Sequence, residues 1–259
     1  MFIAGLIIFI IGSCIGSFLN VLICRVPEKK SLVRDRSHCP QCKEFIKWYD
    51  LFPIISFFIL RGRCRKCKKK ISWQYPLVEF FTGISFVFIA WRFNFVFDNP
   101  FFYRDLIFLS ALVVVFVTDF RFYLILDAVV LPMIVFALIF NIFFFSNNED
   151  VLYQVMMFGG AAILSGGFFL FQYLISQGKW IGFGDIKFGI LLGAMLGWPN
   201  ILVSLYFSYV IGAVVMIIFI FLKKKKMNEQ VAFGTFLSIG AFIALFYGDQ
   251  IVNWYLNYL

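Results

Sequence analysis

The chain has 259 residues, of which 62% are hydrophobic and only 14% are charged; it contains 38 Phe, its mean hydropathy is +0.91 and its net charge is +9. So few charges cannot supply the polar exterior that a soluble domain of this length needs. The composition therefore excludes a soluble globular protein and predicts a polytopic membrane protein. We interpret the positive charge as a marker of membrane topology, and no nucleic-acid partner is expected.

The apolar segments predict an all-α fold with about eight transmembrane helices. A spanning helix needs roughly 20 mostly apolar residues, and the first runs without a charge from Met1 to Cys24 and stops at Arg25. A basic start is missing, which argues against a cleaved signal peptide. The further spans are predicted at 76–98, 101–118, 127–146, 151–176, 186–199, 200–222 and 232–256.

Lys and Arg in the short connections predict the orientation, because cytosolic loops retain positive charge. If Met1 starts outside, the basic connections all fall inside, and the even number of helices places both termini outside. These connections are the segment from Arg25 to Tyr75, the turn with Arg121, the loop with Lys179 and the run Lys223 to Lys226.

Residues 26–75 form a basic cytosolic domain between the first two helices, with residues 1–25 before it and a seven-helix membrane domain at 76–259. The domain carries two C-x₂-C pairs about 20 residues apart, the spacing of a structural zinc site. Free thiols or an iron site are the alternatives. Four cysteines close the metal shell, so no position is left for a catalytic water. The ligands are Cys39, Cys42, Cys64 and Cys67.

The chain has a single histidine, His38, which precedes the first zinc cysteine. A Ser-His-Asp triad and an H-E-x-x-H metalloprotease both need histidine at positions where this sequence has none. The chemistry expected in the membrane therefore rests on carboxylates.

Two aspartates lie at the edges of apolar segments that are too short to cross the membrane alone. Thirteen residues separate Asp119 from Asp105, and Pro199 interrupts the run that follows Asp185. Both acids fall on the predicted cytosolic side. Ionisable groups near the bilayer interior are costly and commonly functional, although a buried structural pair is the alternative.

Two carboxyl groups held close together share a proton, which is the arrangement of aspartic proteases. One ionised group can take a proton from an attacking water while the other donates to the peptide carbonyl. Gly182 and Gly184, around Phe183 in "GFGD", would let the backbone approach a substrate strand. The GxGD pattern alone is a weak motif.

Four motifs in order closely resemble the bacterial type IV prepilin peptidases over nearly the whole chain: "GSCIGSFLNVLICRVP", the tetracysteine segment, "TDFRFYLILDAVVLP" and "GFGDIKFG". The resemblance implies an eight-helix aspartic endopeptidase of the bacterial inner membrane. It would cut the leader from prepilins and pseudopilins at the cytosolic face. By position the catalytic pair is Asp119 and Asp185. Asp127 matches the second acid of its motif, with Leu126 where proline is common. Lys187, Gly182 and Gly184 are expected to bind substrate or shape the site.

Many members of this family also methylate the new N-terminus with S-adenosylmethionine, an activity associated with the zinc loop. Gly62 in "RGRC" and Glu79 in "YPLVE" match positions of the family pattern. A turn glycine, and a role of Glu79 in helix packing or loop anchoring, are the alternatives. No strand followed by G-x-G-x-x-G is found, so the methyl donor would need an unconventional pocket.

Two other classes are weighed against a peptidase: a proton-coupled transporter, and a non-enzymatic scaffold of a pilus or secretion system. Only the peptidase needs both carboxylates together at one membrane edge. The basic loop is expected to contact anionic lipid headgroups, and the substrate helix to dock laterally near Asp119 and Asp185. The sequence leaves the pilin substrate and the oligomeric state open.

Overall fold

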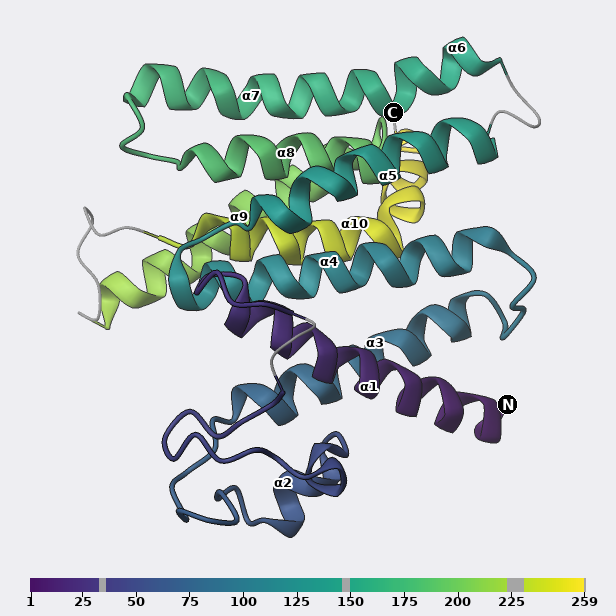
Figure 1. The fold of residues 1–259 in the computed structure, drawn as a ribbon. Coiled ribbons are helices and arrows are strands. Elements are labelled where there is room, and N and C mark those ends of the chain that lie inside the picture. Colours follow the sequence, from purple (N-terminus) through teal and green to yellow (C-terminus); the bar gives the residue numbers. More distant parts are fainter. Residues whose placement is uncertain (33–35, 146–149, 223–230, 259) are drawn as a thin grey trace. The chain divides into compact units, whose positions relative to one another are not determined.

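The computed structural model describes residues 1–32, 36–145, 150–222 and 231–258, and over these residues the regular structure is helical apart from two isolated β-bridges (Figure 1). The basic run Lys223 to Lys226 lies outside the described residues. The chain divides into two compact units, Met1–Val114 and Val115–Leu259, and the boundary falls inside one long helix, α4 (Pro100–Phe122). Each unit is described by itself.

Six helical segments of the described residues are long and apolar enough to cross a membrane, which confirms a polytopic membrane protein. The fourth segment, Val151–Ser176, consists of α6 and α7 joined by a π-helical turn, η2 (Val155–Gly159). The other bounds are α1 (Phe2–Arg25), α5 (Asp127–Phe145), α6 (Val151–Gln154), α7 (Gly160–Ser176), α9 (Asn200–Phe221) and α10 (Phe233–Leu256).

Two further helices bring the apolar segments close to the predicted number of eight. α3 (Gln74–Arg92) has 19 residues and contains Glu79. α8 (Phe183–Leu196) has 14 residues, about 21 Å at 1.5 Å per residue, which is shorter than a hydrocarbon core of about 30 Å. The number of true spans is therefore approximate.

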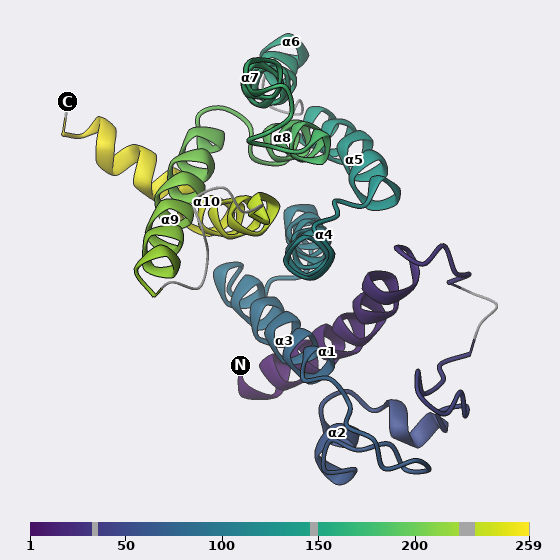
Figure 2. The same cartoon turned by 90° about the vertical axis from the view of Figure 1, so that its left-hand side faces the viewer.

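The first unit is built on α1 and α3, which run antiparallel in close contact (Figures 1 and 2). Small residues permit this approach: a Cβ added to Gly16 would lie 2.8 Å from Glu79 Cα, and one on Gly12 would lie 2.9 Å from Gly83 Cα. At the end of the pair nearest the tetracysteine domain, Asn20 Nδ2 donates to the carbonyl of Tyr75 over 3.2 Å.

In the second unit α8 lies between α7 and α5, and α9 packs against α10 (Figure 2). The contact of α7 with α8 is tight, because Gly189 packs against the Phe169 ring, and Ser165 Oγ donates to the Gly189 carbonyl over 2.7 Å. On the other side of α8, the buried side chain of Asn141 on α5 donates to the Ala194 carbonyl over 2.8 Å. Such satisfied polar contacts favour helix association where water is absent.

Several predicted boundaries differ from the observed ones by a few residues, among them those of α3, α4 and α8. The helix predicted at 76–98 ends at Arg92, because Asn94 and Phe95 adopt positive φ. The helix predicted at 101–118 continues to Phe122, so Asp119 lies within α4. The segment predicted from 186 begins at Phe183, so Asp185 belongs to the first turn of α8.

Candidate active site and metal site

Asp119 lies in the last turn of α4 with its side chain buried. Its Oδ2 accepts a hydrogen bond from the backbone N–H of Thr235, in the first turn of α10, over 2.8 Å. The Thr235 hydroxyl is 3.3 Å from the same oxygen but only 2.5 Å from the carbonyl of Ala232. A hydroxyl has one proton, so the amide is the principal donor to Asp119.

Asp185 is held at the start of α8, where it is also buried. Gly182 is the N-cap residue, and its N–H donates to Asp185 Oδ2 over 2.9 Å. Asp185 thus accepts this bond as the N3 acid of a capping box does. The tight turn therefore fixes the carboxyl group of the GxGD segment from within the segment itself.

The second unit brings the two acids together, close enough for their carboxyl groups to interact electrostatically. Ile125 lies beside two glycines of this site, Gly184 next to Asp185 and Gly234 near Asp119. A Cβ on Gly184 would be 3.0 Å from Ile125 Cβ, and one on Gly234 would be 3.1 Å from Ile125 Cδ1. A Cβ on Gly234 would also be 3.0 Å from Asp119 Oδ2. The site is thus formed by the end of α4, the starts of α8 and α10, and the segment that precedes α5.

The other two candidate site residues form an ion pair with each other. Lys187 Nζ lies 2.7 Å from both carboxylate oxygens of Asp127, and it also lies 5.0 Å from the centre of the Phe183 ring. Asp127 begins α5 after a break at 123–126. Asp119 and Asp127 therefore lie on different helices, as the separate spans predicted at 101–118 and 127–146 imply.

Sequence reasoning missed the partners of Asp119, which are Gly234 and Thr235. The only signal was a Gly-Thr pair at the beginning of a long apolar helix, at 233–256. Nothing in the local sequence links that pair to an acid 116 residues earlier.

The four cysteines of the first unit converge as the spacing predicts. Their sulfur atoms all lie within 4.8 Å of one another, and the Cys39–Cys67 and Cys42–Cys64 sulfur pairs are 3.9 and 4.0 Å apart. A zinc ion with four ligands at about 2.3 Å would place the sulfurs about 3.8 Å apart. The donor set and its size therefore fit a tetrahedral metal ion.

Each C-x₂-C pair folds as the same small turn. Cys39 N–H donates to the backbone carbonyl of Glu44, and Cys64 N–H donates to that of Lys69. The residue after each second cysteine, Lys43 or Lys68, has φ near +57°. Backbone N–H groups of the second turn, first that of Cys67 and then that of Lys66, lower the pKa of the Cys64 thiol to about 7. This favours the thiolate form of Cys64. At Cys42 the backbone N–H of Glu44 lowers the pKa, but burial and the neighbouring thiols outweigh it and raise that pKa to about 11.

Gly62 lies at the entry to the second turn. Its φ of +65° suits glycine, and its N–H donates to the carbonyl of Phe57 over 2.8 Å. A Cβ at this position would lie 3.0 Å from Phe57 Cζ. The backbone conformation and the nearby Phe57 ring therefore both favour glycine at this position.

Glu79 is buried in α3 and faces a short helical segment of the same unit, η1 (Trp48–Leu51) and α2 (Ile55–Ile59). Its Oε2 accepts from the Ile54 N–H over 2.7 Å, and the Ser17 hydroxyl of α1 also bonds this carboxyl group. Glu79 therefore anchors the segment between the two cysteine pairs to the membrane helices.

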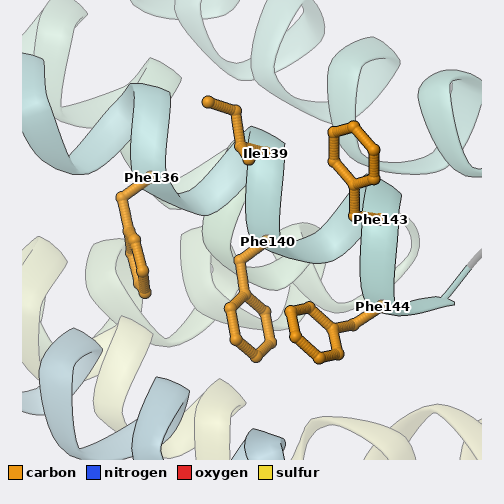
Figure 3. Close-up of a pocket in the computed structure, with 5 residues that line it drawn as sticks. All are labelled: Phe136, Ile139, Phe140, Phe143 and Phe144. Carbon is orange, nitrogen blue, oxygen red and sulfur yellow. The ribbon is translucent and has the colours of Figure 1, made fainter.

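An apolar recess of about 470 Å³ runs along α5 and is lined by side chains of that helix (Figure 3). It begins at Phe136, nine residues or about 13 Å along the helix from Asp127. It has no ionisable lining residue, so it offers no acid–base chemistry. The lining residues are Phe136, Ile139, Phe140, Phe143 and Phe144.

The chain is similar to known proteins over almost its full length. The profile of the bacterial peptidase A24 N-terminal domain matches residues 10–93, and that of the type IV leader peptidase family matches residues 106–217. Proteins named prepilin leader peptidase/N-methyltransferase are similar throughout. The one from Stutzerimonas stutzeri is 32% identical over 96% of this chain and 92% of its own length.

Two further proteins of the same name show the range of this similarity. The protein from Pseudomonas aeruginosa is 30% identical over 96% of this chain and 92% of its own length. The protein from Bacillus subtilis is 29% identical, and 97% of each chain is covered. No solved structure matches the chain.

Proposed function

The chain belongs to the type IV leader peptidase family, and from this premise we propose that Asp119 and Asp185 are the catalytic pair of a membrane aspartic endopeptidase. The observation that carries the proposal is the meeting of these two buried carboxyl groups at the end of α4 and the start of α8. Two acids that interact in a site of low dielectric constant share one proton, as aspartic peptidases require.

The pair would act on a peptide bond by general acid–base catalysis. The ionised carboxylate takes a proton from a water molecule as the water oxygen attacks the carbonyl carbon, and the neutral carboxylic acid protonates the carbonyl oxygen. As the tetrahedral intermediate collapses, the carboxyl group that took the proton from water donates it to the leaving amine nitrogen, and the other carboxylate takes back the proton of the former carbonyl oxygen. The backbone N–H groups of Thr235 and Gly182 hold the two carboxyl groups in place for this exchange.

The residues around the pair would bind substrate or shape the site. Lys187 and Asp127 form an ion pair that joins α8 to the start of α5. Gly182 and Gly184 keep the backbone before and after Phe183 free of side chains, although Ile125 occupies the space beside Gly184. The approach of a substrate strand is therefore proposed at Gly182.

The proposed substrates are prepilins and pseudopilins, whose short basic leader precedes a hydrophobic helix. Leader removal at the cytosolic face of the bacterial inner membrane requires the ends of α4, α8 and α10 to lie on that side. Arg121 in the last turn of α4 and Lys179 in the connection between α7 and α8 are consistent with this orientation. The substrate helix would dock laterally against the apolar helices next to Asp119 and Asp185.

We propose that the tetracysteine site binds one structural zinc ion. The four sulfur donors fill its shell, so the ion would fold residues 39–67 rather than activate water. The domain is too small to fold on a hydrophobic core alone. Ion pairs of Lys66 with Glu44 and of Arg65 with Asp50 join the first half of the domain to the second turn.

The same protein is proposed to methylate the new N-terminus with S-adenosylmethionine, as the names of its relatives indicate for those proteins. Gly62 and Glu79 both shape the backbone of the tetracysteine domain, Gly62 at a turn and Glu79 through Ile54. We therefore expect them to influence methylation through the form of this domain.

The basic surface of the domain is proposed to orient the enzyme on anionic lipid. Lys68, Lys69 and Lys70 follow the last cysteine, and a charge near an anionic leaflet is worth about 1 kcal/mol. A scaffold or a transporter role is not favoured, because the chain belongs to a family of peptidases.

A cleavage assay tests the proposed catalytic pair. Purified protein in detergent is incubated with a prepilin peptide, and loss of the leader and gain of a methyl group are followed by mass spectrometry. Asp119→Asn and Asp185→Asn should each abolish cleavage while the protein stays inserted and folded. Asp127→Asn is the matched control, because its carboxyl group is exposed and paired with Lys187. Cleavage retained in either of the first two variants would overturn the assignment.

A further inference from the structure

Between the two cysteine pairs lies an apolar segment that the metal site does not explain. Residues 51–60, "LFPIISFFIL", contain no charge and are flanked by Asp50 and Arg61. They form the end of η1 and all of α2, and they are too short to cross a bilayer. Apolar runs of about this length are typical of re-entrant or interfacial segments.

Half of the residues in this segment are exposed, and all of these are large and apolar. Phe57 is buried against Trp73, with ring centres 4.8 Å apart, whereas Ile55, Phe58 and Ile59 on α2 are exposed. Exposing so many large apolar groups to water would be costly, at about 25 cal/mol per Å². The large side chains that are exposed are Leu51, Phe52, Ile55, Phe58 and Ile59.

The backbone of the segment is tied to residues inside the membrane helices. Ile54 has φ +63° and ψ −55°, outside helix and strand, and its N–H donates to the buried carboxyl group of Glu79. The Ser17 hydroxyl bonds the same group from α1. Irregular backbone is tolerated at membrane depth only where the protein satisfies its polar groups, which is what Glu79 does for Ile54.

The depth of this anchor follows from the two helices. Ser17 lies eight residues, about 12 Å, before the end of α1 at Arg25, and Glu79 lies five residues, about 8 Å, after the start of α3 at Gln74. In Figure 1, α2 lies beside the first turns of α3. Since α1 carries no charge before Arg25, this level lies inside the hydrocarbon region.

The surroundings of the segment match a membrane boundary. Trp48 and Trp73 stand on either side of it in the sequence, both exposed, and indole rings favour the level of the lipid headgroups. The neighbouring surface of α3 is equally apolar, since Phe80 and Phe81 are exposed there. Large apolar groups are therefore exposed both on α2 and on the turn of α3 that follows Glu79.

We propose that residues 51–60 form a re-entrant segment that dips into the leaflet from which the tetracysteine domain projects, with its exposed side chains among the lipid acyl chains. Glu79 is the positioning residue that sets the depth. The segment lies between the two cysteine pairs, so its insertion holds the metal site close to the membrane surface. The proposal depends only on membrane insertion of the chain and is independent of the catalytic assignment.

Photo-crosslinking of the full chain in vesicles of phosphatidylcholine and phosphatidylglycerol tests the proposal. A benzophenone analogue of phenylalanine is placed at position 58 or at position 45. Phe58 and Phe45 are matched in exposure, at 62% and 64% of the residue surface. They differ in location, because Phe45 lies at the first cysteine turn and not in the apolar segment. Lipid adducts at the acyl chains, measured by mass spectrometry, should be roughly tenfold more abundant at position 58.

Three results would overturn the proposal: equal adducts at the two positions, adducts at the headgroup alone, or a crosslink from position 58 to a second copy of the chain or to a prepilin in place of lipid. Zinc content and solubility show that each labelled protein is folded, so a negative result counts against the segment and not against the preparation.

The role of Glu79 is tested in the same assay. Glu79→Gln keeps an oxygen that can accept from the Ile54 N–H, whereas Glu79→Ala removes it. Acyl-chain adducts at position 58 should persist in the Gln variant and fall severalfold in the Ala variant, with zinc content unchanged in both. An equal yield in the two variants would show that Glu79 does not set the depth.

Discussion

The tetracysteine site and the aspartate pair are held by contacts of very different range. Each cysteine turn closes through hydrogen bonds between residues four or five positions apart, such as Cys64 N–H to Lys69. Asp119 depends on a backbone N–H of Thr235, 116 residues later in the chain. A cysteine cluster of this kind can therefore be found from spacing alone, whereas the environment of the proposed catalytic acid is fixed by helix packing that no short motif records.

The two regions are also stabilised differently, one by local turns and metal binding and the other by the packing of long helices. The tetracysteine domain has short elements, two β-bridges and many exposed aromatic groups, so a metal ion would supply much of its folding free energy. The acid pair lies among long helices whose close contacts, such as Gly189 with Phe169, do not involve a metal. Damage to one region should consequently leave the other largely intact.

The largest expected effect is the loss of metal. Cys39→Ser/Cys42→Ser should reduce bound zinc from one ion per chain to none and make residues 26–75 sensitive to proteases, because structural zinc contributes on the order of 10 kcal/mol. Elemental analysis and limited proteolysis measure this. Cys14→Ser is the control, since Cys14 is far from the cluster in α1. Rapid and fully reversible loss of leader cleavage on chelation would instead indicate a catalytic metal.

A smaller but specific loss is expected at Gly234. A methyl group there would lie 3.0 Å from Asp119 Oδ2 and displace the carboxyl group by a few tenths of an ångström. Gly234→Ala should lower the rate of cleavage by about tenfold, because catalysis is sensitive to such shifts. Gly167→Ala, on α7 with no atom within 4 Å of its Cβ, is the control. Normal cleavage by both variants would show that catalysis does not depend on the exact position of the Asp119 carboxyl group.

The lysines after the last cysteine should matter only on charged membranes. Changing Lys68, Lys69 and Lys70 together to Gln should slow cleavage by about fivefold in anionic liposomes and leave it unchanged in neutral detergent. Rates measured in both media decide this. An equal loss in the two media means that the lysines contact substrate or support the fold.

The smallest effect is expected at the exposed ion pair. Asp127→Asn should change cleavage by about twofold, since exposed pairs contribute no more than about 1 kcal/mol, and the difference should shrink in high salt. Rates at low and high ionic strength measure it. A loss as severe as that of Asp119→Asn would mean that the second acid of the motif is the catalytic one.

Much of the fold could be predicted from hydropathy, because an apolar run of sufficient length has few alternatives in a membrane protein. The errors came from charged residues that long-range contacts satisfy. Asp119 was expected to end its helix, but the Thr235 amide stabilises its carboxyl group and α4 continues to Phe122. Asp185 was expected before its helix, but it caps the first turn through Gly182.

Residue types and spacing singled out both acids and all four cysteines, and the structure brings the members of each set together. They could not identify Gly234, Thr235 or Ile125, whose importance comes from which helices meet. Glu79 was also ambiguous in sequence. Its anchoring of Ile54 emerges only when α3 and the segment between the cysteine pairs are seen together.

The central claim is that Asp119 and Asp185 act as one unit with a shared proton. Cleavage of a prepilin peptide by Asp119→Asn, Asp185→Asn and the double variant tests it most directly. Each single variant should lose about 10³-fold in rate or more, and the double variant should lose no more than the worse single one, because residues of one catalytic unit are not additive. Losses that multiply in the double variant, or activity near wild type in either single variant, would contradict the pair.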